Sequence, residues 1–364
     1  MSFDFNSIWL TIFMLSALVV VHEFGHFIMA RAFGVKVHEF SIGFGPILSK
    51  FDWKGIQYTI RWFLLGGFVK IAGLDIALEG EGESEKSQEK WRTFQDISLW
   101  QKIVVIAAGP IFNLLLALVI IFCTAAFIGV PNDLRNDQPI IEQASPGTPA
   151  FEAGIRPGDE VLNINGLSVQ KWRDIPAIIS KNGGKTLSIK IKRQDQILLK
   201  KITPMFDPVN KRHIIGISAV LDYKTLPIKE ATKITFTYPW TYTVGIVKTF
   251  QLMFSGKLKG GLMGPIGMVA VVEQNTRLHP YNTFALAFSI SMFLCLFNLL
   301  PLPLPLLDGG WIVILLIERL LRREFSAEQK AAAQMVGLAA FLVLGVIIAY
   351  GDILTSFKRF FLGG

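Results

Sequence analysis

The chain has 364 residues, of which 51% are hydrophobic and 18% are charged, and its formal net charge is +8. Its mean hydropathy is +0.46. Soluble domains carry about 25% charged residues, so this composition argues against an ordinary soluble protein and favours a membrane protein. The two cysteines, Cys123 and Cys295, lie within apolar stretches. We expect them to be packing residues and not a disulfide or a metal pair.

Four apolar stretches are long enough to cross a membrane as helices: residues 8–32, 103–130, 283–307 and 331–350. The second and the fourth contain no charged residue. The first is too long for a cleaved signal peptide and lacks a basic start. The sequence therefore predicts a polytopic α-helical membrane protein with about four transmembrane helices.

The short flanks of these stretches predict an orientation. Residues 1–7 contain no Lys or Arg, whereas three basic residues lie within 31–50 and four within 319–330. Loops rich in Lys and Arg stay on the cytoplasmic side, so the N-terminus is expected outside. The long segment 131–282 is placed outside as well, because long domains translocate largely regardless of their charge. The basic residues of the C-terminal tail argue mildly for the opposite orientation.

The first apolar stretch contains His22, Glu23 and His26 in an HExxH pattern. On a helix, residues four apart share a face, so both imidazoles can bind one metal ion. Glu23 lies about 100° around the helix, close enough to act on a metal-bound water. Ionisable groups at membrane depth are costly and are functional candidates by default. The alternative is a pair of helix histidines whose hydrogen bonds are satisfied by neighbouring polar groups.

Residues 37–70 contain several glycines around strand-like runs such as 56–60, which predicts a β-hairpin or a small sheet. Its apolar content indicates that it enters the membrane beside the first helix, where such backbone must line a cavity or lie against protein. A hairpin at the membrane surface is the alternative. The polar segment 79–90, rich in glutamate, is expected to be a solvated loop.

Residues 140–204 predict a compact α/β module, with strands near 160–164 and 187–191 and one helix near 175–180. Residues 153–159 and 163–166 resemble a PDZ domain. Such domains bind extended peptides as an added strand, and the alternative is a steric spacer with an empty groove. The aromatic and lysine-containing segment 222–261 predicts amphipathic helices at the outer membrane surface, or ordinary packing against the module.

A catalytic zinc ion usually has three protein ligands and one open position, so the histidines need a third partner. Asp308 is the best candidate, because it ends an apolar stretch whose Pro301, Pro303 and Pro305 prevent a regular helix. The carbonyl groups freed there require a polar cavity or protein contact. An interfacial helix cap is the plain alternative for Asp308. Glu318 is the rival ligand, as in a different class of membrane zinc protease.

Taken in chain order, these features resemble the site-2 protease family, in particular its RseP-type bacterial members. The motifs that carry the resemblance are residues 22–26, 43–46, 65–70, 109–113, the PDZ-like insert, 264–267, 298–301 and 307–309. The segment 301–305 is two residues longer than the family's usual Pro-x-Pro, which changes the register between Asn298 and Asp308. Only one PDZ-like module is present, whereas some members have two.

The resemblance implies a zinc-dependent intramembrane endopeptidase in which His22, His26 and Asp308 bind Zn²⁺ and Glu23 is the general base. Asn298 would hold the substrate backbone. An edge strand near 66–70 would bind an unwound substrate as an added strand, and the expected substrate-binding residues of this strand are Gly66, Gly67, Phe68 and Val69.

The expected substrates are single-span membrane proteins, such as anti-sigma factors already trimmed outside, and remnant signal peptides. The expected location is the bacterial inner membrane, and the expected partners are the lipid bilayer and these substrates, with no nucleic acid. The alternative is a non-catalytic membrane PDZ scaffold or a metal carrier, neither of which needs Glu23.

These inferences divide the chain into segments. We predict a first transmembrane helix (1–34), a membrane-associated β region with an acidic loop (35–99), a second helix (100–130), the PDZ-like domain (131–221), a membrane-surface linker (222–282), a third helix (283–310), a cytoplasmic loop (311–331) and a fourth helix with the tail (332–364).

Overall fold

The computed structural model describes residues 5–74, 91–134, 137–207, 212–255, 272, 279–302 and 307–361. The chain divides into two compact units. The first comprises Met1–Phe122 and Gly264–Ala349, and the second comprises Cys123–Met263 and Tyr350–Gly364. The predicted acidic loop 79–90 and the motif 264–267 lie outside the described residues.

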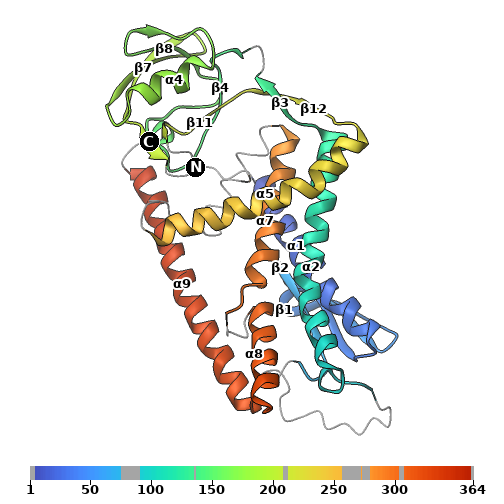
Figure 1. Cartoon of the computed structure of the whole chain (residues 1–364). Coiled ribbons are helices and arrows are strands. Elements are labelled where there is room, and N and C mark those ends of the chain that lie inside the picture. Colours follow the sequence, from blue (N-terminus) through green and yellow to red (C-terminus); the bar gives the residue numbers. More distant parts are fainter. Residues whose placement is uncertain are drawn as a thin grey trace. The chain divides into compact units, whose positions relative to one another are not determined.

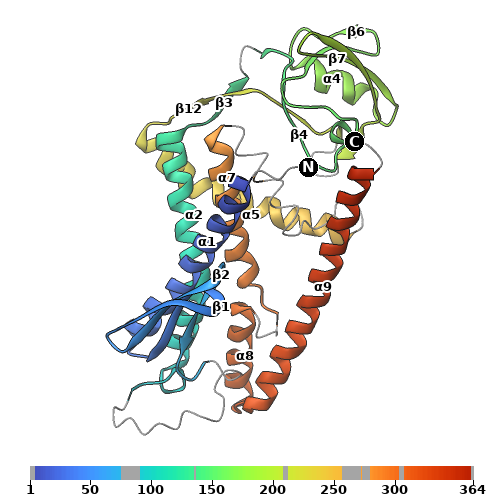
Figure 2. The ribbon, with the colours of Figure 1, turned by 180° about the vertical axis from the view of Figure 1, so that it is seen from behind.

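The first unit is built on long helices and one β-hairpin. Its helices include α1 (Phe5–Ala32), α2 (Leu99–Cys123), α7 (Pro280–Asn298) and α8 (Asp308–Leu321). The short 3₁₀ turn η1 (Phe94–Asp96) precedes α2. The helices α1, α2 and α7 lie side by side in both views (Figure 1, Figure 2). Apolar runs of this length become helices in a membrane because a helix satisfies its own backbone groups.

Among the described residues, three helices are long and apolar enough to cross a membrane. They are Ile8–Ala32, Leu99–Ile128 and Pro280–Asn298, and each overlaps one of the first three predicted stretches. The fourth predicted stretch falls within α9 (Ala327–Phe361), which is helical but is not one of these three. The count of about four transmembrane helices therefore stays a prediction.

The structure corrects the predicted boundaries near the third span. The helix α7 ends at Asn298, and α8 begins at Asp308, so the stretch 283–307 is not one continuous helix. Proline lacks a backbone N–H, and the prolines that follow Asn298 cannot continue the helix. The predicted cytoplasmic connection 311–331 contains most of α8 and the start of α9, and its side of the membrane stays a prediction. The residues Ile314 and Leu315 of α8 are buried, which explains why this segment folds as a packed helix.

The hairpin confirms the β structure predicted between the first two helices. Its strands are β1 (Val37–Trp53) and β2 (Ile56–Ile71), joined at a turn where Lys54 and Gly55 both have positive φ. Residues 39–42 of β1 pair with both 57–60 and 67–70 of β2, so the two long strands form several paired segments. Within the described sheet, residues 67–70 pair only with β1 and form an outer segment.

A buried ionic network ties these segments together. The carboxylate of Glu39 is 5% exposed and accepts hydrogen bonds from Thr59 Oγ1 and Arg61 Nη2, each at 2.7 Å. Lys70 Nζ lies 3.2 Å from its second oxygen. Burial raises the pKa of Glu39, but the hydrogen bonds from these partners outweigh burial and hold the pKa below its ordinary value. Arg61 also donates to the carbonyl of Gly45 at 2.7 Å.

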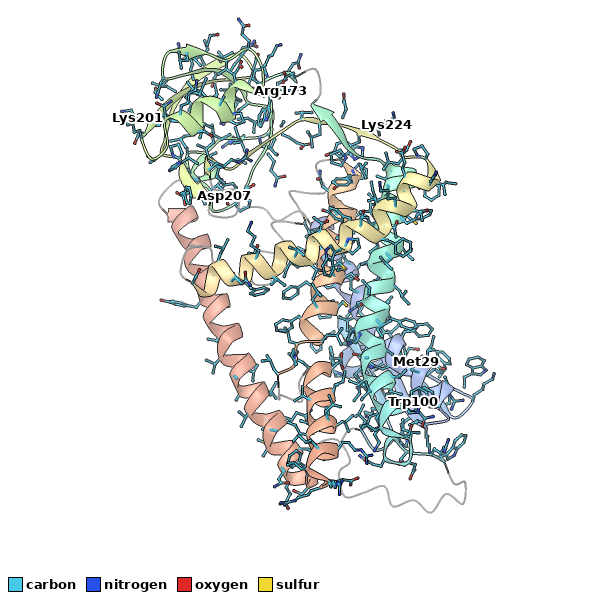
Figure 3. The ribbon with its side chains drawn as sticks, viewed as in Figure 1. Met29, Trp100, Arg173, Lys201, Asp207 and Lys224 are labelled. Carbon is cyan, nitrogen blue, oxygen red and sulfur yellow. The ribbon has the colours of Figure 1, made fainter. Side chains whose placement is uncertain are left out.

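The ends of α1 and α2 pack against the base of the hairpin. The buried side chains of this cluster include Ala30 of α1, Ile71 of β2, Val105 of α2 and Leu315 of α8. Trp100 of α2 packs edge-on against Phe33, with ring centroids 5.4 Å apart. Figure 3 labels Trp100 and Met29 in this region, where side chains of both helices meet the hairpin. The cluster holds α1, α2 and α8 together about one helical turn beyond His26 on α1.

The second unit contains the predicted α/β module. Its main sheet has the order β6-β5-β7-β8, with strands β5 (Glu160–Ile164), β6 (Leu167–Ser168), β7 (Leu187–Arg193) and β8 (Gln196–Ile202). Further strand pairs are β3 (Val130–Leu134) with β12 (Leu221–Lys224), β4 (Ile141–Ala144) with β11 (Ile217–Ala219), and β9 (Met205–Asp207) with β10 (Arg212–Ile214). The helical elements are the π-helical turn η2 (Thr124–Ile128), α3 (Pro149–Glu152), α4 (Asp174–Lys181) and α5 (Ile228–Phe254).

The core of this module lies between the sheet and α4. The buried residues Ile164, Leu187 and Ile189 of the sheet pack with Ile175 and Ile179 of the helix. Charged side chains such as Lys201 of β8 stand on the outside of the module (Figure 3). The apolar alternation along β7 places every second residue in this core, as expected for a strand with one buried face.

One prediction concerns a buried ion pair in this module. Asp159 is fully buried, and Arg193 binds it through Nε at 2.7 Å and Nη2 at 2.8 Å. The hydrogen bonds to Asp159 raise the pKa of Arg193. Replacing Arg193 by Ala leaves a buried carboxylate unpaired, so we expect β5 and β7 to lose about 3 kcal/mol of stability. Hydrogen exchange of these strands in the intact chain measures this loss. The exposed neighbour Lys192, replaced by Ala, is the matched control. Equal exchange in the two variants would contradict the prediction.

Candidate metal centre

The helix α1 presents His22 and His26 on one face. Both side chains are buried, and each residue is 8% exposed. Their ring centroids lie 4.9 Å apart in an edge-on arrangement, and their Nε2 atoms are 3.2 Å apart. The spacing of four residues on a helix explains this arrangement. The structure therefore brings the two predicted histidine ligands together.

Asp308, the first residue of α8, faces the two rings. Its Oδ2 atom lies 3.1 Å from His22 Nε2, and its Oδ1 atom lies 3.5 Å from His26 Nε2. One donor atom from each of the three residues lies within 4.8 Å of the others. Among the described residues, Asp308 Oδ2 is buried and has no hydrogen-bond partner. A buried carboxylate oxygen that faces an imidazole nitrogen and has no other partner among the described residues fits a site that holds a cation.

The donor set suits zinc in a catalytic arrangement. Two imidazole nitrogens and one carboxylate oxygen are typical zinc ligands, and three protein ligands leave one position open. The surroundings are apolar, since α1 is a candidate membrane span. A charge-neutralising partner is needed for Asp308 in such surroundings, and a divalent ion bound by these three side chains would supply it.

The helix α2 completes the site with contacts that the sequence did not reveal. Nδ1 of His26 lies 2.9 Å from the backbone carbonyl of Val105. Nδ1 of His22 lies 3.2 Å from the side-chain amide of Asn113. Asn113 is completely buried, and Ser291 of α7 donates a hydrogen bond to its backbone carbonyl at 2.7 Å. The available signal was that Asn113 is the one amide side chain in the apolar stretch 103–130.

A glycine of α2 provides the space for both rings. A Cβ atom on Gly109 would lie 2.2 Å from His26 Nε2 and 2.8 Å from His22 Cε1. On the facing helix, a Cβ atom on Gly25 would lie 2.4 Å from the carbonyl oxygen of Ala108. The two helices therefore approach closely at the level of the histidines, and only glycine fits at either position.

The remaining predicted residues lie on neighbouring elements. Glu23 follows His22 on α1 and is half-buried, and Asn298 is the half-buried last residue of α7. Gly66 and Gly67 are buried in β2. A Cβ atom on Gly66 would lie 3.3 Å from Val19 Cγ1. Val19 is one helical turn before His22, so this part of β2 packs against α1 close to the histidines.

Phe68 and Val69 continue the same strand and are half-buried. Phe68 pairs with Ser41 and Val69 with Phe40 of β1. Both residues therefore belong to the outer segment of the hairpin.

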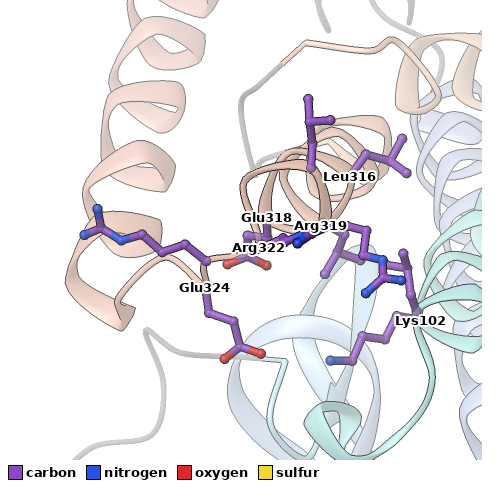
Figure 4. Close-up of a pocket in the computed structure, with 10 residues that line it drawn as sticks. Lys102, Leu316, Glu318, Arg319, Arg322 and Glu324 are labelled. Atoms are coloured by element: carbon purple, nitrogen blue, oxygen red, sulfur yellow. The ribbon is translucent and has the colours of Figure 1, made fainter.

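Glu318, the rival ligand, belongs to a different cluster (Figure 4). Glu318 lies ten positions after Asp308 on α8, which corresponds to about 15 Å along a helix. Its carboxylate accepts hydrogen bonds from Lys330 Nζ at 2.9 Å and from the backbone N–H of Phe325 at 2.7 Å. It lines a cavity of about 930 Å³ whose charged residues are largely basic and include Lys102 and Arg319. Glu318 therefore stabilises the end of α8 and is not one of the three converging residues.

Comparisons with known proteins give a consistent result. The family model described as Peptidase family M50 matches residues 10–344. The Regulator of sigma-W protease RasP of Bacillus subtilis is 27% identical, and the match covers 96% of this chain and 98% of that protein. The Zinc metalloprotease RasP of Bacillus licheniformis is also 27% identical, over 96% of this chain and 99% of that protein. The Probable protease eep of Enterococcus faecalis is 29% identical, over 96% of this chain and 98% of that protein.

Among solved structures, the PDZ domain of the SdrC-like protein from Listeria monocytogenes matches part of the chain. The match covers 24% of this chain and 94% of that domain, with 21% sequence identity and a TM-score of 0.21.

Proposed function

Because the chain belongs to the site-2 protease family, peptidase family M50, and is a metalloprotease, we propose that it is a zinc-dependent intramembrane endopeptidase. Its substrates are the transmembrane segments of single-span membrane proteins. One observation carries this proposal. His22 and His26 lie on α1, a helix apolar enough to cross a membrane, and Asp308 of α8 converges with them. Membership of this family argues against the alternative of a non-catalytic scaffold or a metal carrier.

In this proposal His22 and His26 hold zinc through Nε2, and Asp308 holds it through its carboxylate. Zinc, when bound, supplies a Lewis acid for the scissile carbonyl and makes a water molecule more acidic. Glu23 takes the proton from the attacking water and delivers it to the leaving amine. The half-buried position of Glu23, next to His22 on α1, supports this role. The surrounding helices limit the access of bulk water to the reacting atoms.

A transmembrane helix hides its peptide bonds in internal hydrogen bonds, so it must unwind before it can be cleaved. We propose that the outer segment 67–70 of β2 binds the unwound substrate as an added strand. Its pairing on one side only, within the described sheet, supports this role. The Glu39, Arg61 and Lys70 network keeps this segment in a fixed position for the incoming strand. Asn298 is proposed to hold the substrate backbone.

The substrate class follows from the same reasoning. Anti-sigma factors already trimmed outside the membrane and remnant signal peptides have no bulky domain on the external side of their single span. The name of the Bacillus subtilis relative, Regulator of sigma-W protease RasP, supports the first class. The PDZ-like module would exclude substrates with large external domains. We place the protein in the bacterial inner membrane, with the N-terminus and this module outside the cytoplasm.

The test combines metal analysis with a cleavage assay. The purified chain should contain about one zinc ion and cleave a labelled single-span substrate, and a chelator should abolish cleavage until zinc is restored. Replacing Asp308 by Asn should remove zinc and activity together, because the third ligand loses its charge. Replacing Glu318 by Gln is the control and should leave the zinc content unchanged.

Two results would contradict this assignment. The first is zinc retained after the Asp308→Asn substitution but lost after the Glu318→Gln substitution. The second is cleavage that is insensitive to the chelator.

A further inference from the structure

We propose that Asn113 is a positioning residue for the metal centre. Its side-chain oxygen accepts a hydrogen bond from Nδ1 of His22 and thereby presents Nε2 of the same ring to the metal. This inference rests on the proposed function, because it assigns Asn113 to the zinc site. Neither the HExxH pattern nor the converging Asp308 requires an amide at this place.

The second histidine shows the arrangement that a zinc ligand needs. Nδ1 of His26 lies 2.9 Å from the carbonyl of Val105, and a carbonyl can only accept a hydrogen bond. Nδ1 of His26 must therefore carry the proton, which leaves the lone pair of Nε2 free for a metal. Zinc-binding histidines usually donate their other N–H in this way, and the acceptor fixes both the tautomer and the orientation of the ring.

The equivalent nitrogen of His22, Nδ1, faces a side-chain amide, which can either donate or accept a hydrogen bond. The amide nitrogen of Asn113 lies 3.2 Å from His22 Nδ1. An amide nitrogen donates, so this orientation makes Nδ1 an acceptor and places the proton of His22 on Nε2. That atom lies 3.1 Å from Asp308 Oδ2 and 3.2 Å from His26 Nε2. A protonated Nε2 cannot bind a metal, so this orientation of the amide is incompatible with zinc at this position.

The unpaired oxygen of the same amide indicates how the conflict is resolved. Asn113 Oδ1 is buried and has no hydrogen-bond partner among the described residues. The oxygen and nitrogen of an amide have nearly the same shape, and a half-turn of the group exchanges their positions. After this exchange, the oxygen accepts the Nδ1–H of His22, and the nitrogen occupies the position where the oxygen was unpaired. The number of unpaired amide atoms does not rise.

The surroundings of Asn113 keep the amide beside the ring in either orientation. Asn113 is completely buried, and its backbone carbonyl accepts a hydrogen bond from Ser291 Oγ at 2.7 Å. The spacing along α2 also matters, because Val105 and Asn113 lie eight residues apart with Gly109 midway between them. Residues spaced by four recur on one helix face, so this face of α2 supplies an acceptor for each ring and the space between them.

The experiment compares two substitutions that separate hydrogen bonding from packing. The Asn113→Leu substitution keeps a similar volume without an acceptor, and the Asn113→Asp substitution keeps the acceptor and adds a negative charge. We expect Asn113→Leu to weaken zinc binding by about 10–100-fold, and Asn113→Asp to stay within about threefold of the unmodified chain. Zinc affinity is measured on the full chain by competition with a chromogenic chelator. Thr235→Val is the matched control, because it removes a buried hydroxyl that, among the described residues, bonds only within α5, to the carbonyl of Ala231, and it should leave the zinc affinity unchanged.

A packing role for Asn113 predicts the opposite order. Leucine would then be tolerated, and a buried aspartate would lower both stability and zinc affinity. Unchanged affinity after Asn113→Leu, or an equal loss in both variants, would overturn the inference. The nitrogen chemical shifts of histidine in the unmodified, zinc-loaded chain provide a test that needs no variant. His22 should show a protonated Nδ1 and a metal-bound Nε2, and the reverse assignment would also overturn it.

These results are distinguishable from a failure of the proposed function. An unmodified chain that neither binds zinc nor cleaves a substrate counts against the zinc site itself. An unmodified chain that does both, together with an Asn113→Leu variant of equal affinity, counts only against the role of Asn113.

Discussion

Replacing Glu23 by Gln should reduce cleavage of a single-span substrate by at least about 10²–10⁴-fold, the usual contribution of a general base. Glutamine has nearly the same shape as glutamate but cannot take a proton from water. Neither His22 nor His26 loses its position on α1, so the zinc content should stay at the level of the unmodified chain. The prediction therefore separates proton transfer from metal binding at neighbouring residues.

The measurement is the cleavage rate of a labelled single-span protein in reconstituted membranes, together with the zinc content of the same preparation. Glu230, an exposed residue in the first turn of α5, is the matched control when it is replaced by Gln. Unchanged cleavage by the Glu23→Gln variant would remove Glu23 from the mechanism. Loss of zinc together with activity would instead assign Glu23 to the binding of the metal.

Replacing Gly109 by Ala should abolish zinc binding while leaving the chain folded. The added Cβ atom would lie 2.2 Å from His26 Nε2 and 2.8 Å from His22 Cε1, so neither ring could keep its position. Alanine is a better helix former than glycine by about 1 kcal/mol, so the substitution favours α2 itself. The expected combination is an intact helix, a loss of zinc affinity of more than about 100-fold and no measurable cleavage.

Gly245 of α5 offers the same substitution in open space, because a Cβ atom there has no neighbour within 4 Å. The Gly245→Ala variant should keep its zinc and its activity. Circular dichroism and metal analysis of both variants test the prediction. A Gly109→Ala variant with a full complement of zinc would show that the rings can move without losing the ion, contrary to the close contacts described above.

Much of the candidate metal centre could be predicted from the sequence because its parts obey local rules. His22 and His26 share a face through the helical period, and this relation needs no knowledge of the tertiary structure. Asp308 was recognisable as an ionisable residue at the end of an apolar stretch. The hairpin and the α/β module followed from alternating apolar residues and from glycines at turns.

The contacts from α2 could not be predicted in the same way. His22 and Asn113 are 91 residues apart in the chain, and their contact depends on how α1 and α2 cross. Resemblance to a known family identified the segment 109–113, but the role of its glycine became clear only when the distance from Gly109 to the rings was known. The prolines after Asn298 predicted an interruption of the helix, but hydropathy continues through them and does not give the residue at which α7 ends.

The separation of the three proposed metal ligands along the chain has a consequence for biosynthesis. Asp308 follows His22 by 286 residues (308 − 22), so the ribosome makes α1 long before it makes α8. A nascent chain that has inserted its first helix has two imidazoles but no carboxylate, and it cannot assemble the complete donor set. Under the proposed zinc site, proteolytic competence can arise only after Asp308 has been synthesised and α8 has packed beside α1.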